Sequence, residues 1–349
     1  MNISGLSIRS LLALSATMMF GGIVQAAELT GAGASLPAPV YERWSDAYLK
    51  ATGNRINYQS IGSGGGIKEV SGKSIDFGTT DIPLSTADLE KNGLLQFPTM
   101  VGGAVPIINL PGIKTDELRL SGVVLGDIYM GKITQWNDKA IRALNPSVKL
   151  PDMSIAIVHR GDGAGTSFVF TNYLSKVHPQ WRDKVGTGTI VQWPTGMHGK
   201  GDEGVATFVR NLPGAIGYVE YAYARQKKLD TVQMQNRAGS FVSANEQSLK
   251  AAANAPWQQS AFGEILTDQA GQDVWPIAGA TFIVMRRKEE KAAAANEALK
   301  FFLWSYRNGA AMAQAQGYAP LPERVMSDVQ AHWSGIVDAA SGKPVFGAN

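Results

Sequence analysis

The sequence RINYQSIGSGGGIKEVS, residues 55–71, decides the fold class. Its first six residues, Arg55–Ser60, alternate in polarity as a strand does, residues 62–66 include four glycines, and residues 67–71 are predicted to form a short helix. A strand that enters a helix through a glycine-rich turn is typical of α/β proteins. This stretch therefore predicts an α/β architecture.

The same pattern recurs along the chain. Residues 29–35, LTGAGAS, precede a predicted helix in which Val40, Trp44 and Tyr48 share one face. A strand over 75–78 ends at the sequence TTD, residues 79–81. A strand over 154–159 opens into RGDGAGT, residues 160–166, and a helix is predicted from about 167 to 176.

The C-terminal part predicts a long helix over 288–308 that is closed by Gly309, and a last helix that begins at Pro322. Two apolar extended segments, 100–110 and 277–285, are interpreted as crossovers between two domains. We expect residues 27–103 plus 275–349 to form a discontinuous domain I, and residues 104–274 to form domain II.

Composition bounds the possible functions. The chain has 349 residues, enough for two domains, and only 17% are charged. Low charge with 44% hydrophobic residues argues against disorder. A net charge of +3, without long basic clusters, argues against nucleic acid as the main partner. The absence of cysteine excludes disulfides, thiolate metal sites and cysteine nucleophiles.

Residues 1–26 are interpreted as a cleaved signal peptide. Arg9 precedes the apolar run 11–20, and small residues at 24 and 26 predict cleavage before Ala27. The apolar run is shorter than the roughly 20 residues that a membrane span needs. The absence of a cysteine for lipid attachment favours the periplasm as the location.

The three glycine-rich turns are candidate anion sites. Helix N-termini carry unpaired N–H groups, and glycine lets the backbone approach a ligand closely. Ser35, Ser63 and Thr166 add hydroxyl donors at these turns. Ordinary helix capping is the alternative for each turn. No Walker sequence, nucleophile elbow or His-Glu-x-x-His pattern is present, so no nucleotide, esterase or metal site is predicted.

Arg160 and Asp81 indicate which kind of anion these turns would bind. Arginine binds tetrahedral oxyanions through two N–H groups, although a surface pair with Asp162 is the alternative for Arg160. Asp81 follows the end of a strand, and its negative charge is unexpected in a site that binds an anion. A capping role before Pro83 would explain it, and so would acceptance of a proton that the ligand carries. Phosphate carries such a proton at neutral pH, and sulfate does not.

The sequence resembles the periplasmic phosphate-binding proteins of Pst-type ABC importers, the PstS family. The resemblance rests on residues 29–41, on 58–66 and 76–81, on 160–168, on GAIGYVEY at 214–221 and on WPI at 275–277. These motifs run through nearly the whole chain after the signal segment. The resemblance implies a two-lobed, type II-like binding protein with two hinge strands and phosphate in the cleft between the lobes.

The resemblance also implies a set of ligand contacts. Asp162 would support Arg160. Three positions depart from the family pattern: Ser35 stands for threonine, Leu36 for phenylalanine, and Ala164 for serine, which removes one hydroxyl donor. The implied phosphate-binding residues are Ser35, Leu36, Ser63, Asp81, Arg160, Ala164, Gly165 and Thr166.

The implied function is capture of inorganic phosphate and its delivery to the permease subunits of an ABC transporter, by a monomeric periplasmic protein that is not an enzyme and uses no cofactor. The alternatives are a receptor for another tetrahedral oxyanion such as sulfate, a phosphate-ester hydrolase, and an exported surface protein. A hydrolase would need a nucleophile–base pair or a metal cluster, and the sequence shows neither.

Overall fold

A computed structural model describes residues 27–347, so the predicted signal peptide, residues 1–26, lies outside the described residues. The elements up to residue 184 are β1 (Glu28–Gly33), α1 (Ala38–Thr52), β2 (Arg55–Ser60), α2 (Ser63–Ser71), β3 (Phe77–Thr80), α3 (Thr86–Asn92), β4 (Leu94–Asn109), β5 (Arg119–Leu120), α4 (Gly122–Tyr129), α5 (Lys139–Leu144), β6 (Ala156–Arg160), α6 (Gly165–Val177) and α7 (Pro179–Lys184).

The remaining elements complete both halves of the molecule. They are β7 (Met197–Gly199), α8 (Gly201–Asn211), β8 (Ala215–Glu220), α9 (Tyr221–Lys227), β9 (Asp230–Thr231), β10 (Gln233–Gln235), β11 (Phe241–Val242), α10 (Glu246–Ala252), η1 (Trp257–Ser260), β12 (Ala278–Arg286), β13 (Lys288–Glu289), α11 (Ala292–Asn308), α12 (Ala310–Ala315), β14 (Ala319–Pro320), α13 (Glu323–His332), η2 (Trp333–Gly335) and β15 (Val337–Asp338).

The main sheet has the strand order β2-β1-β3-β12-β4-β8-β6-β7, and β9 and β14 also pair with β4. The strands β2, β1 and β3 are parallel, and β12 runs antiparallel to both β3 and β4. On the other side of β4, the strands β8, β6 and β7 are parallel to one another. The long strand β4 therefore connects two parallel α/β groups, which confirms the predicted fold class.

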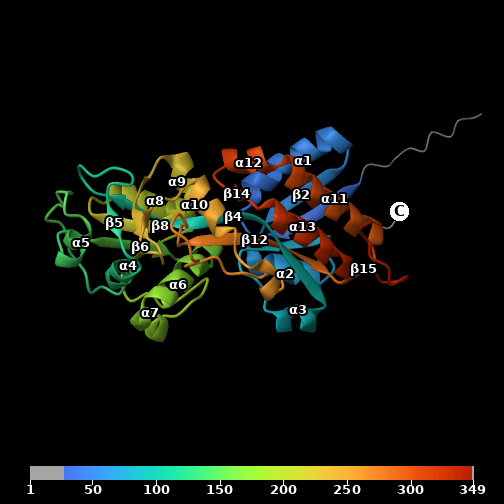
Figure 1. Ribbon diagram of the computed structural model, residues 1–349, viewed down its shortest axis with the longest axis horizontal. Helices are drawn as coiled ribbons and strands as arrows, with labels where there is room; N and C mark the ends of the chain where they lie inside the picture. Colours follow the sequence, from blue (N-terminus) through green and yellow to red (C-terminus); the bar gives the residue numbers. More distant parts are fainter. Residues whose placement is uncertain (1–26, 348–349) are drawn as a thin grey trace, which may run out of the picture.

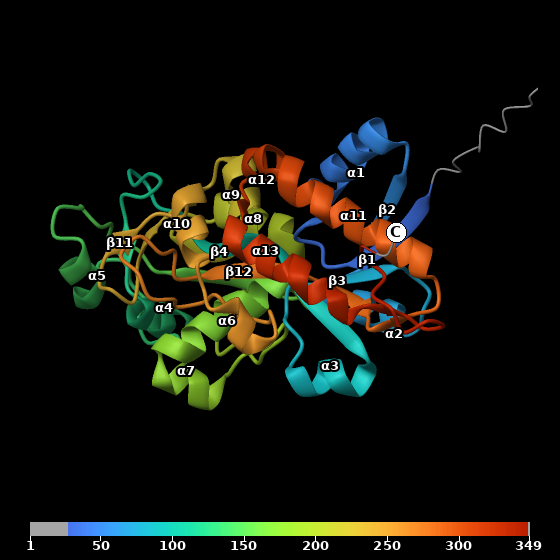
Figure 2. The ribbon, with the colours of Figure 1, turned by 45° about the vertical axis from the view of Figure 1, so that its right-hand side comes forward.

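β4 changes its partner at one point. Gly103 pairs with Ala278 of β12, and the next residue, Ala104, pairs with Glu220 of β8. Figures 1 and 2 show β4 and β12 running between the half that holds α1, α2 and α11 and the half that holds α6, α8 and α9. On this basis we propose the lobe boundaries 27–103 with 275–349, and 104–274.

The amphipathic patterns of the sequence are confirmed by burial. Val40, Trp44 and Tyr48 of α1 are all buried. From α11, the ring of Phe302 makes an edge-on contact with Phe77 of β3, at 5.0 Å between centroids. Helices from both ends of the chain thus cover the same parallel strands, as burial of an apolar helix face requires.

Two predicted helix starts are wrong by a few residues. The helix after β2 begins at Ser63 rather than 67, and the helix after β6 begins at Gly165 rather than 167. Glycine disfavours a helix, but packing decides here. A Cβ on Gly66 would lie 2.6 Å from the Ala32 carbonyl oxygen. Gly66 is therefore required where the first turn of α2 lies against the β1 backbone.

The long C-terminal helix begins at Ala292, not at 288 as predicted. Lys288 and Glu289 form β13 and pair with β15. The Glu289 carboxylate is buried and accepts from Arg286 Nη2 at 2.8 Å. Strand pairing and this ion pair hold the segment extended. The last helix begins one residue after Pro322, which is its N-cap. The strands β3 and β6 each begin two residues later than expected.

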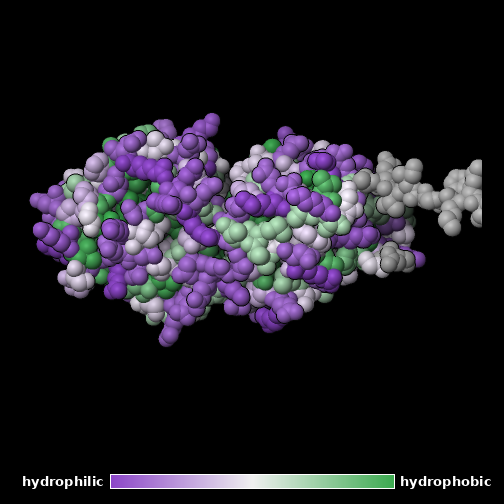
Figure 3. Space-filling model, turned by 90° about the horizontal axis from the view of Figure 1, so that it is seen from above, coloured by the Kyte–Doolittle hydropathy of each residue, from purple (hydrophilic) through white to green (hydrophobic). Residues whose placement is uncertain are grey.

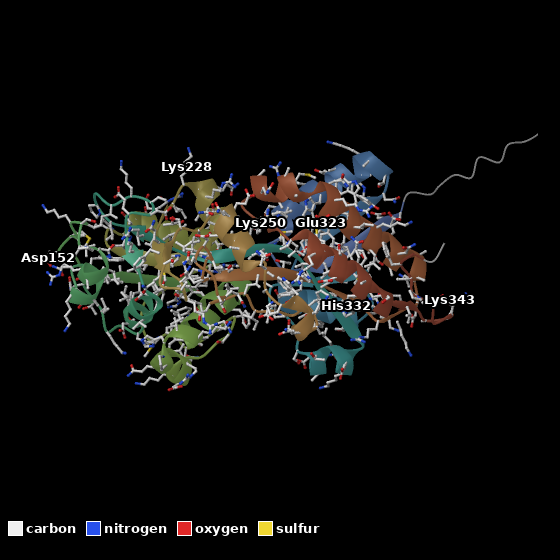
Figure 4. All side chains as sticks on the ribbon, viewed as in Figure 1. Asp152, Lys228, Lys250, Glu323, His332 and Lys343 are labelled. Atoms are coloured by element: carbon white, nitrogen blue, oxygen red, sulfur yellow. The ribbon has the colours of Figure 1, made fainter. Side chains whose placement is uncertain are left out.

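The molecule is elongated, and Figure 4 shows Asp152 and Lys343 at opposite ends of its long axis. Figure 3 shows a notch in the outline between the two halves. Within residues 27–347, no helix combines the length and the apolar character that crossing a membrane would require.

Candidate anion-binding site

The turns after β1 and β2 form the first half of the candidate site. Ser63 is the first residue of α2, and the N–H groups of residues 63–65 have no acceptor among the described residues. These are the donors that every helix N-terminus leaves unpaired. Ser35 accepts a hydrogen bond from Ser60 Oγ at 2.7 Å, so its own hydroxyl hydrogen can still be donated. This half-site presents donors only.

Asp81 adds an acceptor at the end of β3. The side chain is buried, and Oδ1 accepts from Thr281 Oγ1 at 2.8 Å. The Asp81 N–H donates to Ser63 Oγ at 3.1 Å, which ties the carboxyl to the start of α2. Burial raises the pKa of the Asp81 carboxyl to about 7. Near neutral pH this group can therefore exchange a proton with a ligand beside it.

Arg160 forms the centre of the second half of the site, at the end of β6. Nε and Nη2 donate to the two carboxylate oxygens of Asp162 at 2.9 and 2.6 Å, and Nη1 donates to Asp202 Oδ1 at 2.7 Å. These contacts use three of the five guanidinium N–H groups, so one remains on Nη1 and one on Nη2. The hydrogen bond from Arg160 lowers the pKa of Asp162 to about 2.

The N-terminus of α6 lies beside Arg160. Ala164 is the N-cap and provides no side-chain cap, and Gly165 and Thr166 are the first two helical residues. The N–H groups of Gly165 and Thr166 have no acceptor among the described residues, whereas that of Ala164 donates to the Thr189 carbonyl oxygen. The exposed N–H groups and the helix dipole both favour an anion at this point. This half-site therefore combines one fixed cation with a free helix start.

The two half-sites meet at Gly165. A Cβ at this position would lie 2.5 Å from both Cβ and Oδ2 of Asp81. Such a distance is well inside van der Waals contact, so only a glycine allows the start of α6 to approach the Asp81 carboxyl. The close approach places the start of α6 against the Asp81 carboxyl.

Gly165→Ala is therefore expected to weaken anion binding at least tenfold, because the added methyl would force α6 away from Asp81. Overpacking of this kind costs roughly 1–3 kcal/mol. Gly163→Ala in the same turn is the matched control, since its Cβ would have Ile190 as its nearest neighbour at 3.6 Å. Titration calorimetry of both variants measures the effect. Equal affinities would show that the approach at Gly165 is not needed.

All of the predicted site residues line one cleft of about 650 Å³. They are Ser35, Leu36, Ser63, Asp81, Arg160, Asp162, Ala164, Gly165 and Thr166. Their roles in binding remain proposals, but the structure brings them together from four separate turns. The groups of three or more His, Cys, Asp or Glu side chains that a metal ion would need are absent from residues 27–347.

Sequence reasoning missed three acidic residues of the cleft, Asp202, Glu203 and Glu220. Asp202, near the start of α8, accepts from Arg160, and Glu220 ends β8. Nothing in the sequence links Asp202 to Arg160, because 42 positions separate them and only the fold makes them neighbours. Glu220 lies within the motif at 214–221, and that motif was the available signal.

The fold and the cleft define a two-lobed binding protein, and the comparisons agree. A family model described as a PBP superfamily domain matches residues 23–308. The phosphate-binding protein PstS of Pasteurella multocida is 47% identical over 329 residues, which cover 94% of this chain and 96% of the relative. The PstS of Xylella fastidiosa is 48% identical over 309 residues, with 88% and 85% covered. The chain belongs to the PstS family of the PBP superfamily, which confirms the resemblance.

Solved structures show the same fold at low sequence identity. A phosphate-binding protein from Stenotrophomonas maltophilia has a TM-score of 0.65 at 22% identity, with 92% of this chain and 99% of that chain covered. A human phosphate-binding apolipoprotein has a TM-score of 0.69 at 17% identity, with 91% and 99% covered.

Proposed function

We propose that this chain captures inorganic phosphate in the cleft and delivers it to the permease of a phosphate ABC transporter. One observation carries the proposal: a buried acceptor, Asp81, lines the same cleft as a set of unpaired donors, which are the two free N–H groups of Arg160 and two helix N-termini. The PstS relatives, which are named for phosphate binding, support it.

This arrangement selects for a ligand that accepts many hydrogen bonds and donates one. Hydrogen phosphate does both, because its oxygens accept and its remaining proton is donated to Asp81. Sulfate has no proton to donate, so the ionised carboxylate would face it without a hydrogen bond. Sites with a buried polar group reject ligands that lack the matching group. The sulfate-like alternative is therefore the weaker one.

The proposed role is that of a receptor and not of an enzyme. No histidine lines the cleft among the described residues. Ser63 Oγ accepts from the backbone N–H of Asp81, and Ser35 accepts from another serine, so neither hydroxyl contacts a general base. We further propose that the protein acts as a monomer in the periplasm, without nucleic acid as a partner.

Titration calorimetry of the phosphate-free protein tests this function. We expect saturable 1:1 binding of phosphate and no heat from sulfate at the same concentrations at pH 8.5. Solution scattering should show a smaller radius of gyration with phosphate, since ligand groups come from both halves. Absence of phosphate binding would refute the proposal. Release of phosphate from a monoester substrate would favour the hydrolase instead.

Ala164 stands where the family pattern has serine, and this difference gives a second prediction. Ala164→Ser should tighten phosphate binding by roughly two- to tenfold, since one neutral hydrogen bond contributes about 0.5–1.5 kcal/mol. The hydroxyl oxygen would accept from the uncapped first turn of α6 while its hydrogen is donated to the ligand. Ala164→Gly, which adds no hydroxyl, is the control. Weaker binding by the serine variant would show that the cleft has no room for the hydroxyl.

A further inference from the structure

Glu220 is a buried carboxyl that the proposed phosphate contacts do not use. It ends β8 where β4 changes partner, and its backbone pairs with Ala104. Its side chain lines the cleft, and Oε1 has no hydrogen-bond partner. Oε2 lies 2.8 Å from the hydroxyl of Tyr318, which precedes β14 on the other side of the β4 crossover. The Glu220–Tyr318 contact thus joins the two proposed lobes.

Counting hydrogens indicates the protonation state of Glu220. The Tyr318 hydroxyl is also 2.6 Å from the carbonyl oxygen of Leu36, and a carbonyl can only accept. Tyr318 has a single hydroxyl hydrogen, which the short contact with Leu36 uses. With that hydrogen directed at Leu36, the contact between Tyr318 and Glu220 Oε2 takes its hydrogen from Glu220, which is then a neutral carboxylic acid.

The same residue reaches the second half-site through its backbone. The Glu220 N–H donates to Asp202 Oδ2 at 3.2 Å, and the other oxygen of Asp202 accepts from Arg160. A continuous chain of hydrogen bonds therefore runs from Leu36 in the first turn, through Tyr318 and Glu220, to Arg160. Chains of this kind hold their members in one arrangement as long as each member is satisfied.

We propose that protonated Glu220 is a positioning residue, which donates to Tyr318 and so fixes the Leu36 turn relative to Arg160 for phosphate binding. The expected effect on phosphate affinity rests on the proposed function, whereas the protonation of Glu220 does not. Ionisation of Glu220 would remove the donor and add a negative charge to the cleft. Phosphate binding should then weaken as the pH rises.

The acidic groups around Glu220 also favour its neutral form, whereas the hydrogen bond with Tyr318 opposes this. Asp202 from α8 and Asp81 from the end of β3 are both acidic, and Tyr318 is neutral. The cations of the cleft are Lys200, just before α8, and Arg160 from β6, and Arg160 already pairs with Asp162 and Asp202. Burial, followed by the charge of Asp202, raises the pKa of Glu220 well above its usual range. A neutral Glu220 at physiological pH agrees with the hydrogen-bond geometry.

The proton can be observed without phosphate. Infrared difference spectra between the wild type and Glu220→Gln, recorded at pH 7, should contain the C=O stretch of a protonated carboxylic acid that disappears in the variant. Glu290→Gln is the matched control, because Glu290 is exposed and pairs with Lys73 on the surface. If the difference spectrum between the wild type and Glu220→Gln contains only a carboxylate band, the inference is wrong.

The positioning role is tested by affinity and its pH profile. Glu220→Leu and Tyr318→Phe should each weaken phosphate binding roughly tenfold at pH 7, the size of one lost hydrogen bond. Glu220→Gln should recover most of this loss, because its amide can donate to Tyr318. Between pH 7 and 10 the wild type should lose affinity faster than Glu220→Gln. Asp81 and the phosphate ionisation are common to both proteins, so the difference isolates Glu220.

The outcomes are distinct. Parallel pH profiles, or no recovery in the glutamine variant, would refute the positioning role even if the leucine variant folds poorly. A wild type that does not bind phosphate would instead refute the proposed function, and the infrared spectra would still decide the state of Glu220.

Discussion

Arg160→Ala is expected to reduce phosphate affinity at least 100-fold. Two N–H groups of Arg160 remain for a ligand, and each charge-assisted hydrogen bond contributes roughly 1.5–3 kcal/mol. The side chain is 11% exposed, so solvent does little to replace it. Arg160→Lys should also bind poorly, because one ammonium group cannot serve Asp162, Asp202 and the ligand with the same geometry. Titration calorimetry at constant pH measures both variants.

Loss of the arginine also affects stability. Asp202 is mostly buried, and removal of its cation leaves an uncompensated carboxylate, which costs about 3–5 kcal/mol in buried pairs. The double variant Arg160→Ala with Asp202→Asn should recover thermal stability but not phosphate affinity. This comparison separates a folding defect from the loss of ligand contacts.

Arg182→Ala is the matched control, since Arg182 is exposed and pairs with its neighbour Asp183 on the surface. Its affinity should equal that of the wild type. If Arg160→Ala binds phosphate within tenfold of the wild type while folded, Arg160 only organises Asp162 and Asp202, and the anion is held elsewhere.

Asp81→Asn is expected to shift the preference for phosphate over sulfate by at least 100-fold toward sulfate at pH 8.5. At this pH the wild-type carboxyl, with its pKa raised by burial to about 7, is ionised. An unpaired ion in a dry site costs several kcal/mol, so sulfate is rejected. Asparagine keeps an acceptor for the proton of phosphate and adds N–H donors for sulfate. Phosphate should lose little.

The pH dependence follows from the direction of the same pKa shift. As the pH falls through about 7, the Asp81 carboxyl takes up a proton and becomes a donor. The wild type should therefore begin to bind sulfate at pH 5.5–6, whereas sulfate binding by Asp81→Asn should change little. Competition titrations at both pH values decide the matter, with Asp183→Asn on the surface as control. An unchanged preference in Asp81→Asn would assign Asp81 a structural role beside Thr281.

Local sequence was sufficient for most of the secondary structure. The strand Arg55–Ser60 and the buried face of α1 were predicted from periodicity alone, because a strand with a two-residue period and a helix with a 3.6-residue period leave different apolar patterns. The helix starts were less accurate. Glycines 64–66 were predicted as a turn but lie inside α2, where Gly66 packs against the β1 backbone.

The candidate site could be predicted only where a turn carries its own chemistry. Ser63, Arg160 and Thr166 stand in glycine-rich turns at helix starts, and such turns expose unpaired N–H groups whatever surrounds them. Asp202 and Glu220 lie in no such turn. Their partners are distant in sequence, and no rule of spacing joins Tyr318 to Glu220 or Arg160 to Asp202.

By itself the sequence therefore determined the α/β class, the three candidate anion-binding turns and the family resemblance, since each depends on residues that are close together in the chain. Only the tertiary structure decided that these turns line one cleft, that Gly165 lies against Asp81, and that Glu220 is buried beside Tyr318. These properties depend on distances and burial between segments far apart in sequence, and such distances are set by how β4 and β12 bring the two halves together.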